Sequence, residues 1–128
     1  SKCIMVNFEQ VIEELVGVRG TLACAIVDYE SGMLLDGRSV ADMDLDILSA
    51  CNTEIIRAEI KSIALMHEKD GQHDEIEDML ITLGTRYYLL RPMKSYPGLF
   101  VFSILDKSNA NLALARRALK DADRHFNA

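Results

Sequence analysis

The sequence contains little proline and glycine, 2 and 7 residues of 128. These low proportions, with 49% apolar and 27% charged residues, exclude a collagen-like or an intrinsically disordered chain. No apolar run approaches the roughly 20 residues that cross a bilayer, and the pattern of a secretory leader is missing as well. We therefore expect a cytoplasmic protein without a membrane span. The length predicts a single domain over 1–128.

Basic residues are outnumbered by acidic ones, and the cysteines lack the pairing pattern of a disulfide-rich chain. The chain has 14 basic against 20 acidic residues, a formal net charge of −6, so a nucleic-acid backbone would be repelled and we expect no such partner. Cys3, Cys24 and Cys51 are odd in number and form no C-x-x-C pair, which disfavours a disulfide framework. Cys24 and Cys51 stand in apolar contexts and are predicted to be reduced core residues.

Motifs that would mark an enzyme or a cofactor site are missing. The sequence holds neither the G-x-x-x-x-G-K-[ST] loop that cradles phosphate nor G-x-G-x-x-G. His67 and His73 stand among acidic residues, but their spacing matches no rigid helical pair of metal ligands, so a solvated loop is favoured. Residues 37–41 only half resemble a nucleophile elbow, because its second glycine is absent. We expect no catalytic residue, no cofactor, no metal site and hence no enzyme.

The hydrophobic pattern predicts the element order α-β-β-α-β-β-β-α in an α+β domain. Helices are predicted over 8–16, 43–68 and 109–126, the first capped by Asn7 and the last by Ser108 or Asn109. A hairpin is predicted over 19–35, and its first strand should be central because its apolar run is nearly continuous. Strands over 76–83, 86–91 and 99–105 should form an antiparallel meander, given the turn residues between them.

The predicted middle helix carries an unusually wide apolar arc. In a projection at about 100° per residue this arc covers about 220°, whereas a surface helix needs little more than about 100°. One edge of the arc contains Cys51 and Ile55, and the other contains Ile56, Ile60 and Ile63. A single sheet cannot cover both edges, so we predict that a second subunit covers one of them; a wholly buried helix is the alternative. We expect Ile60 to face the partner and Ile55 to face the sheet.

The predicted last helix has a basic outer face, formed by Arg116, Arg117, Lys120 and Arg124. Such a face could dock an acidic partner. Alternatively, cations near a helix C-terminus offset the helix dipole and keep the face solvated. The sequence leaves both interpretations open.

Two stretches resemble Roadblock/dynein light-chain domains. Residues 18–35 are similar to the first hairpin of that family, with its G…A-x-V-D-x-x-G-x-x-L pattern. Residues 98–116 are similar to the family's final strand, its D-x-x-x-A-N-L-A-L-A-R turn and its last helix. The resemblance extends over roughly 15–125, which is nearly the whole chain.

The resemblance implies a profilin-like fold, in which a five-stranded antiparallel sheet of order 2-1-5-4-3 has helices on both faces. It further implies a homodimer formed through the middle helix and the third strand, and a non-enzymatic platform for a small Ras-like GTPase. No family motif fixes the surface that contacts the GTPase. The candidate dimer-interface residues are Leu45, Asn52, Ile56, Ile60, Ile63, Met79 and Ile81. A different class of function is a small-molecule sensor of the profilin or PAS type, with a ligand pocket between helix and sheet.

Overall fold

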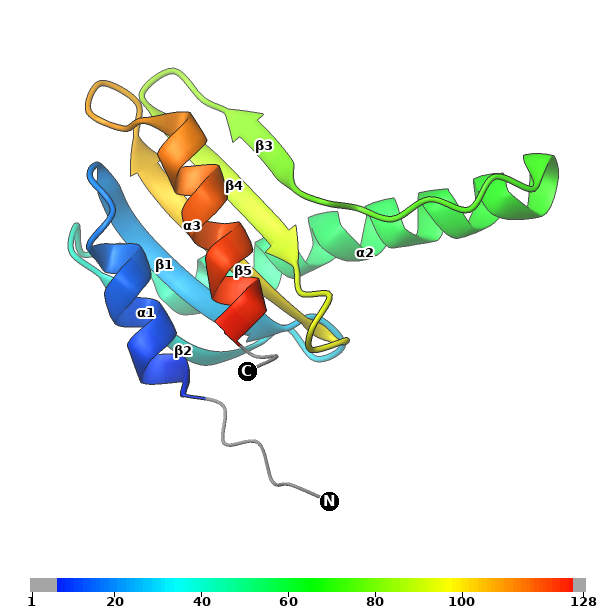
Figure 1. Ribbon diagram of the computed structural model, residues 1–128, viewed down its shortest axis with the longest axis horizontal. Helices are drawn as coiled ribbons and strands as arrows, with labels where there is room; N and C mark the ends of the chain where they lie inside the picture. The colour runs from blue at the N-terminus through cyan, green and yellow to red at the C-terminus, as the bar shows by residue number, and fades with distance from the viewer. Residues whose placement is uncertain (1–6, 126–128) are drawn as a thin grey trace.

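The computed structural model describes residues 7–125, and within this range the predicted element order is confirmed (Figure 1). The elements are α1 Phe8–Val16, β1 Thr21–Asp28, β2 Met33–Ser39, α2 Leu45–Asp70, β3 Met79–Thr82, β4 Arg86–Pro92, β5 Leu99–Asp106 and α3 Leu112–His125. None of these described helices combines the length and the apolar character that crossing a membrane requires.

The strands form one antiparallel sheet in the order β2-β1-β5-β4-β3, which is the order that the resemblance implies. β1 and β5 form its centre, where Ala25 pairs with Phe102 and Ile26 with Val101. Both strands are almost wholly apolar and buried, because each is covered on its two faces. The predicted central position of the first strand is therefore confirmed, and β2 and β3 are the two edges.

Helices cover both faces of the sheet. α1 and α3 lie together on one face and α2 lies on the other (Figure 1). Each side has its own hydrophobic core, and β5 contributes to both because successive residues of a strand point to opposite faces. Val101 and Leu105 belong to the core beneath α1 and α3, whereas Phe100, Phe102 and Ile104 belong to the core beneath α2.

Polar side chains cap the first two helices. The side chain of Asn7 accepts a hydrogen bond from the backbone N–H of Gln10 at 3.1 Å, as the sequence predicts for α1. Asp44 caps α2 in the same way, accepting from the N–H of Ile47 at 3.0 Å. At the other end of α2, Gly71 adopts a left-handed conformation with φ of 74°, which ends the helix two residues after the predicted end at 68.

α3 begins later than the sequence predicts, so the prediction of Ser108 or Asn109 as its cap is wrong. Asn111 is the cap, and its side chain accepts a hydrogen bond from the backbone N–H three residues further on, at 3.2 Å. The carboxylate of Asp106 binds both the N–H and the hydroxyl of Ser108, which holds this segment in a turn. The predicted end of the helix at 126 lies outside the described residues.

β3 is shorter than the strand predicted over 76–83. The segment before β3 is held by side chains and not by a strand ladder. Nη1–H of Arg91 donates to the carbonyl of Glu77 at 3.2 Å, and the guanidinium of Arg116 binds the carboxylate of Asp78 through two hydrogen bonds of 3.1 and 2.7 Å. These arginines are distant in sequence from residues 77 and 78, so periodicity alone could not reveal these contacts.

The two segments that carry the Roadblock resemblance meet at one turn. Gly20 has a φ of +89°, and a Cβ added there would lie 2.8 Å from the Cα of Ala110, so only glycine fits. The carbonyl of Gly20 accepts a hydrogen bond from the N–H of Asp106 at 2.7 Å. The guanidinium of Arg19 donates to Oδ1 of Asn109 at 3.2 and 3.3 Å. The glycine of one motif and the alanine of the other thus form a single packing contact.

The cysteines have different surroundings. Cys24 is buried between the sheet and α1, as predicted, and burial raises the pKa of its thiol to about 12, which keeps it protonated and unreactive. Cys51 is exposed on α2, so its predicted place in the core is wrong. The reason is that this side of α2 points away from the sheet. Cys3 lies outside the described residues.

Candidate partner-binding surface

α2 is much longer than the sheet face that it covers. It has 26 residues, and its buried side chains all belong to the first half: Ser49, Asn52, Thr53 and Ile56. Over residues 57–70 every side chain is exposed except the half-buried Ile63. This second half, which we call the arm, projects beyond the body of the protein (Figure 1). At 1.5 Å per residue the arm is about 20 Å long.

An apolar stripe runs along α2 on the side away from the sheet. We call it the α2 stripe; it comprises Ile47, Cys51, Ala58 and Leu65, which are all exposed. The last three are seven residues apart, a spacing typical of a seam between two helices. They lie roughly opposite Ile56, whose side chain is fully buried. The sequence pattern places Cys51, Ala58 and Leu65 on the same edge of the apolar arc as Ile55, but that edge was predicted to face the sheet, whereas these three side chains are exposed.

β3 is an open edge of the sheet, on the side towards which the arm projects (Figure 1). Among the described strands it neighbours only β4, so its outer edge can accept a further strand. Met79 and Ile81 are half-buried and share one face, whereas Leu80 and Thr82 are exposed on the other. The chain thus has two exposed features that a partner can cover, the open edge of β3 and the α2 stripe.

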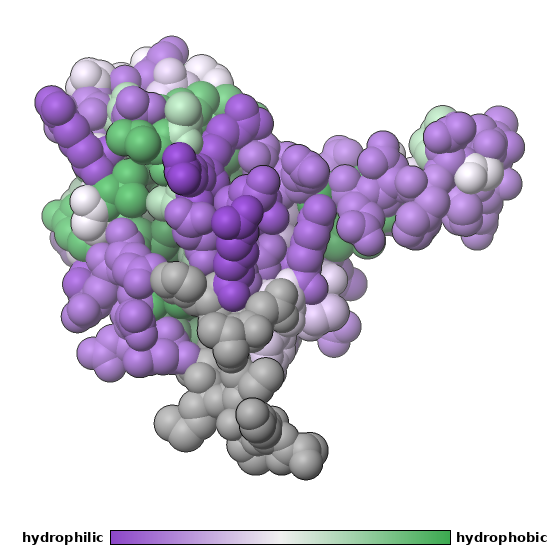
Figure 2. Space-filling view, in the orientation of Figure 1, coloured by the Kyte–Doolittle hydropathy of each residue, from purple (hydrophilic) through white to green (hydrophobic). Residues whose placement is uncertain are grey.

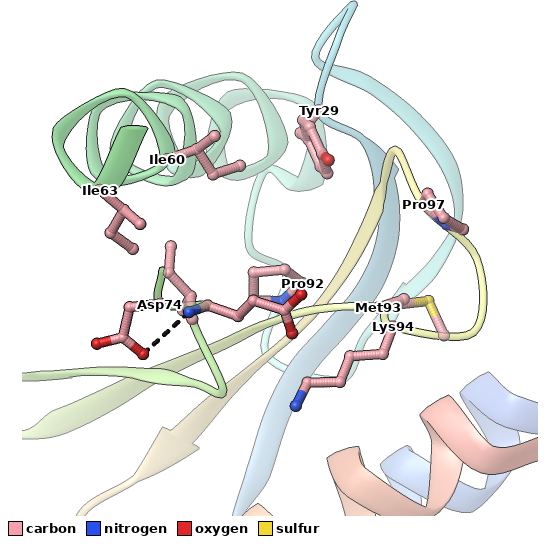
Figure 3. A pocket seen from close by; sticks show the side chains of 10 residues that line it. Tyr29, Ile60, Ile63, Asp74, Pro92, Met93, Lys94 and Pro97 are labelled. Carbon is pink, nitrogen blue, oxygen red and sulfur yellow. Dashed lines mark hydrogen bonds between the residues drawn. The ribbon is translucent and has the colours of Figure 1, made fainter. Parts of the chain in front are cut away.

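A groove lies between the arm and the end of the sheet (Figure 3). Its volume is about 390 Å³, and its apolar wall is formed by Tyr29, Ile60, Ile63, Ile76, Pro92 and Pro97. Figure 3 shows Ile60 and Ile63 pointing from α2 into the space above Pro92. The charged side chains of Asp74 and Lys94 also line the groove. Ile60 and Ile63 therefore face this groove and not the outer side of α2.

The predicted interface residues divide into two groups. Asn52 and Ile56 are 2% and 0% exposed because they pack on the chain's own sheet, so they have almost no surface left for a second chain. The others keep accessible surface and stay candidates: Leu45, Ile60, Ile63, Met79 and Ile81.

The prediction that the Ile55 edge of α2, and not the edge with Ile56, packs on the sheet is wrong, whereas the expectation that Ile60 faces a partner stays a prediction. Ile56, which belongs to the Ile60 edge, is fully buried in the core beneath α2, whereas Ile55 is only half-buried. Periodicity locates the two apolar edges of a helix, but it does not tell from which side the sheet approaches.

The cluster of histidines and acids at the end of the arm has a structural explanation. The rings of His67 and His73 meet edge to face with their centroids 5.4 Å apart, and Nδ1 of His67 lies 3.0 Å from the carbonyl of Gln72. These contacts close the turn that follows Gly71. In the part of the chain that the structure describes, no group of His, Cys, Asp and Glu side chains is arranged to hold a metal ion.

No family model and no curated protein matches the sequence, but solved structures do match in fold. A Roadblock/LC7 domain from Streptomyces avermitilis superimposes with a TM-score of 0.77 at 9% identity, over 95% of this chain and 96% of that one. The chain has the Roadblock/LC7 fold. The gliding protein MglB of Thermus thermophilus matches with a TM-score of 0.75 at 14% identity, over 96% of this chain and 91% of that one.

A further MglB structure, in a tetrameric arrangement, matches with a TM-score of 0.73 at 14% identity, over 96% of this chain and 90% of that one. At such low identities the likeness to the Roadblock/LC7 fold lies in the course of the backbone. This likeness of the backbone agrees with the motif resemblance at residues 18–35 and 98–116. The two segments pack against each other where Gly20 contacts Ala110.

Proposed function

We propose that this chain is a homodimeric, non-enzymatic scaffold or regulator of a small Ras-like GTPase. The observation that carries the proposal is the α2 stripe. The longest helix of this Roadblock/LC7 fold packs one side on its own sheet and leaves a second apolar side open. Contiguous apolar surface of this kind marks an interaction site, and a second copy of the chain is its simplest cover.

In the proposed dimer, α2 packs against α2 and β3 pairs with β3. A twofold axis brings the same stripe of both subunits together, so the contact is self-complementary. Cys51 and Ala58 are small side chains, which lets the two helix axes approach closely. Antiparallel pairing of the two β3 strands joins two sheets into one and removes an exposed strand edge from each subunit.

The role in GTPase regulation rests on the Roadblock resemblance, because domains of that family are platforms for small Ras-like GTPases. The sequence has no phosphate-cradling loop, which supports the proposal that the partner, and not this chain, binds the nucleotide. In this proposal the partner binds and hydrolyses the nucleotide, and this chain supplies a surface.

Two measurements test the proposal. Light scattering coupled to size exclusion should give a mass of about 29 kDa, twice the chain mass of 14.3 kDa. A pull-down from the native source, with GTP and GDP supplied in parallel, should recover a small GTPase in a nucleotide-dependent manner. A monomer at every concentration contradicts the dimer, and stoichiometric binding of GTP to the isolated chain in calorimetry contradicts the regulator.

The groove beneath the arm favours a second candidate function, a small-molecule sensor. Its volume of about 390 Å³ and its mainly apolar wall fall within the range of ligand pockets, about 300–1,000 Å³. If the protein is a sensor, we expect a small molecule to copurify with it and to be detected by native mass spectrometry. If the protein is a scaffold, we expect no copurifying ligand, so the same measurement distinguishes the two functions.

A further inference from the structure

The face opposite α2 carries a polar pocket beside α3, with a volume of about 440 Å³. Its wall combines α3 with β4 and with the segment that leads into β3. Most of the lining residues are basic: Arg91, Arg116, Arg117, Lys120 and Arg124. Figure 2 looks onto this face and shows strongly hydrophilic side chains gathered over α3. We call this site the α3 pocket.

Two of these basic residues are neutralised inside the protein. The Nε of Arg91 lies 3.2 Å from a carboxylate oxygen of Asp123, and both side chains are nearly buried. Arg116 binds Asp78 at 2.7 Å, and this hydrogen bond together with the charge of Asp78 raises the pKa of Arg116. These ion pairs fix two walls of the α3 pocket but leave little charge there for a ligand.

The other three basic residues are available to a ligand. Arg117 and Lys120 are exposed and form no ion pair with any residue in the described part of the chain. Arg124 reaches Asp121 only at 3.9 Å, and 70% of its side chain is exposed. Glu77 is a further acid in the wall, yet the basic residues outnumber the acids. The α3 pocket is therefore positive in a chain whose formal net charge is −6.

We propose that the α3 pocket docks an acidic peptide segment of a partner protein. Guanidinium groups bind carboxylates through paired, charge-assisted hydrogen bonds, and clustered arginines are a recurring means of recognising acidic motifs. A membrane or a nucleic acid presents an extended anionic surface, which the net negative charge of this chain repels. A short acidic segment, in contrast, contacts only the positive α3 pocket and not the negatively charged remainder of the surface. Because the α3 pocket and the α2 stripe lie on opposite faces of the sheet, both can be occupied together.

The test is fluorescence polarisation of a labelled hexaglutamate peptide, with hexaglutamine as the neutral control. The isolated chain should bind hexaglutamate alone, and binding should weaken as salt is raised from about 50 to 500 mM. The double substitution Arg117→Glu and Lys120→Glu should reduce the affinity about tenfold or more. The matched control, Lys61→Glu with Lys69→Glu on the arm, makes the same change in net charge and should reduce it less than about twofold.

Several outcomes overturn the proposal. They are equal binding of both peptides, equal loss in the two double variants, or binding of the wild type to phosphatidylserine vesicles without binding of hexaglutamate. Circular dichroism checks that each variant is folded, and Arg117→Gln with Lys120→Gln replaces the pocket variant if charge reversal unfolds it. The GTPase takes no part in this measurement, so its result is independent of the proposed regulatory function.

Discussion

Arg91 of β4 donates its Nε–H to Oδ2 of Asp123 in α3 at 3.2 Å, and both side chains are more than nine-tenths buried. The same carboxylate accepts hydrogen bonds from the backbone N–H groups of Lys94 and Ser95, at 3.1 and 3.0 Å. Asp123 therefore joins α3 to β4 and to the loop that leads into β5. A buried charge with several donors is costly to disturb, because the remaining partners lose their compensation.

Replacing Asp123 by alanine should lower the free energy of unfolding by about 3–5 kcal/mol, since it leaves the guanidinium of Arg91 buried without its counter-charge. Urea titration followed by circular dichroism measures this. The matched control is Asp121→Ala, two residues away, whose carboxylate contacts Arg124 only at 3.9 Å and at the surface. It should change the free energy of unfolding by less than about 0.5 kcal/mol. Equal effects of the two substitutions would refute the role given to Asp123.

The stability conferred by Asp123 should depend on pH. Burial raises the pKa of Asp123, but the hydrogen bonds from Ser95 and Lys94 and the charge of Arg91 outweigh burial and hold the pKa below its usual value. In the unfolded chain the carboxyl has a pKa of about 3.9. The stabilisation is therefore complete above that pH and disappears as the pH falls through the lower pKa of the folded state.

Comparison of the wild type with Asp123→Asn tests this dependence, because the other carboxyls titrate in both proteins. The difference in their free energies of unfolding should be constant above about pH 5 and should shrink below about pH 4. A difference that grows on acidification would show that the pKa of Asp123 is raised in the folded protein.

Replacing Asn52 by leucine should raise the free energy of unfolding by about 1 kcal/mol. Its Nδ2 group is buried beneath α2 and has no hydrogen-bond partner among the described residues, and such a group costs about 1–3 kcal/mol. The neighbouring Thr53 is the matched control, because its hydroxyl donates to the carbonyl of Ser49 at 2.7 Å. Thr53→Val should therefore lower the stability or leave it unchanged. A stability loss in Asn52→Leu as large as in Thr53→Val would contradict this assignment.

The two sides of α2 should respond differently to a new charge. Ile56→Glu places a carboxylate in the core beneath α2, where its desolvation should unfold the domain. Leu65→Glu changes the α2 stripe, where 54% of the side chain is exposed, so the monomer should stay folded while the proposed dimer weakens about tenfold or more. Circular dichroism and light scattering measure both effects. An unchanged dimer in Leu65→Glu would remove the α2 stripe from the interface.

Local patterns in the sequence predict most of the elements but not the relations between distant ones. The span of α1 and its Asn7 cap follow from spacing within one or two turns, and the structure reproduces them. In contrast, a helical projection places Asp123 on the buried stripe of α3 and Asp121 on the opposite side, but it cannot show that Arg91 of β4 approaches Asp123 and neutralises it. The contacts that hold the segment before β3 are equally hidden from local patterns, since they come from arginines of β4 and α3.

The partner-binding surface on α2 also depends on contacts that local sequence patterns do not reveal. The wide apolar arc of α2 is visible in the sequence, and it indicates two covered sides. Which side meets the sheet depends on the direction in which α2 crosses it, and no local pattern encodes that direction. Ile56 and Ile60 share one edge, yet the first is buried in the core and the second lies beyond the end of the sheet.

The arm has a consequence for how the protein acquires its helical structure. A helical segment as short as residues 57–70, with little tertiary support, is marginally stable in water, because isolated helices need more than about 12–15 residues. In the proposed dimer each arm packs on the other subunit, so folding of its last turns and association become one equilibrium. The ellipticity at 222 nm would then become more negative as the protein concentration increases, in parallel with the fraction of chains that are dimeric. Amide protons of the arm would exchange with solvent faster than those around Ile56, within one continuous helix.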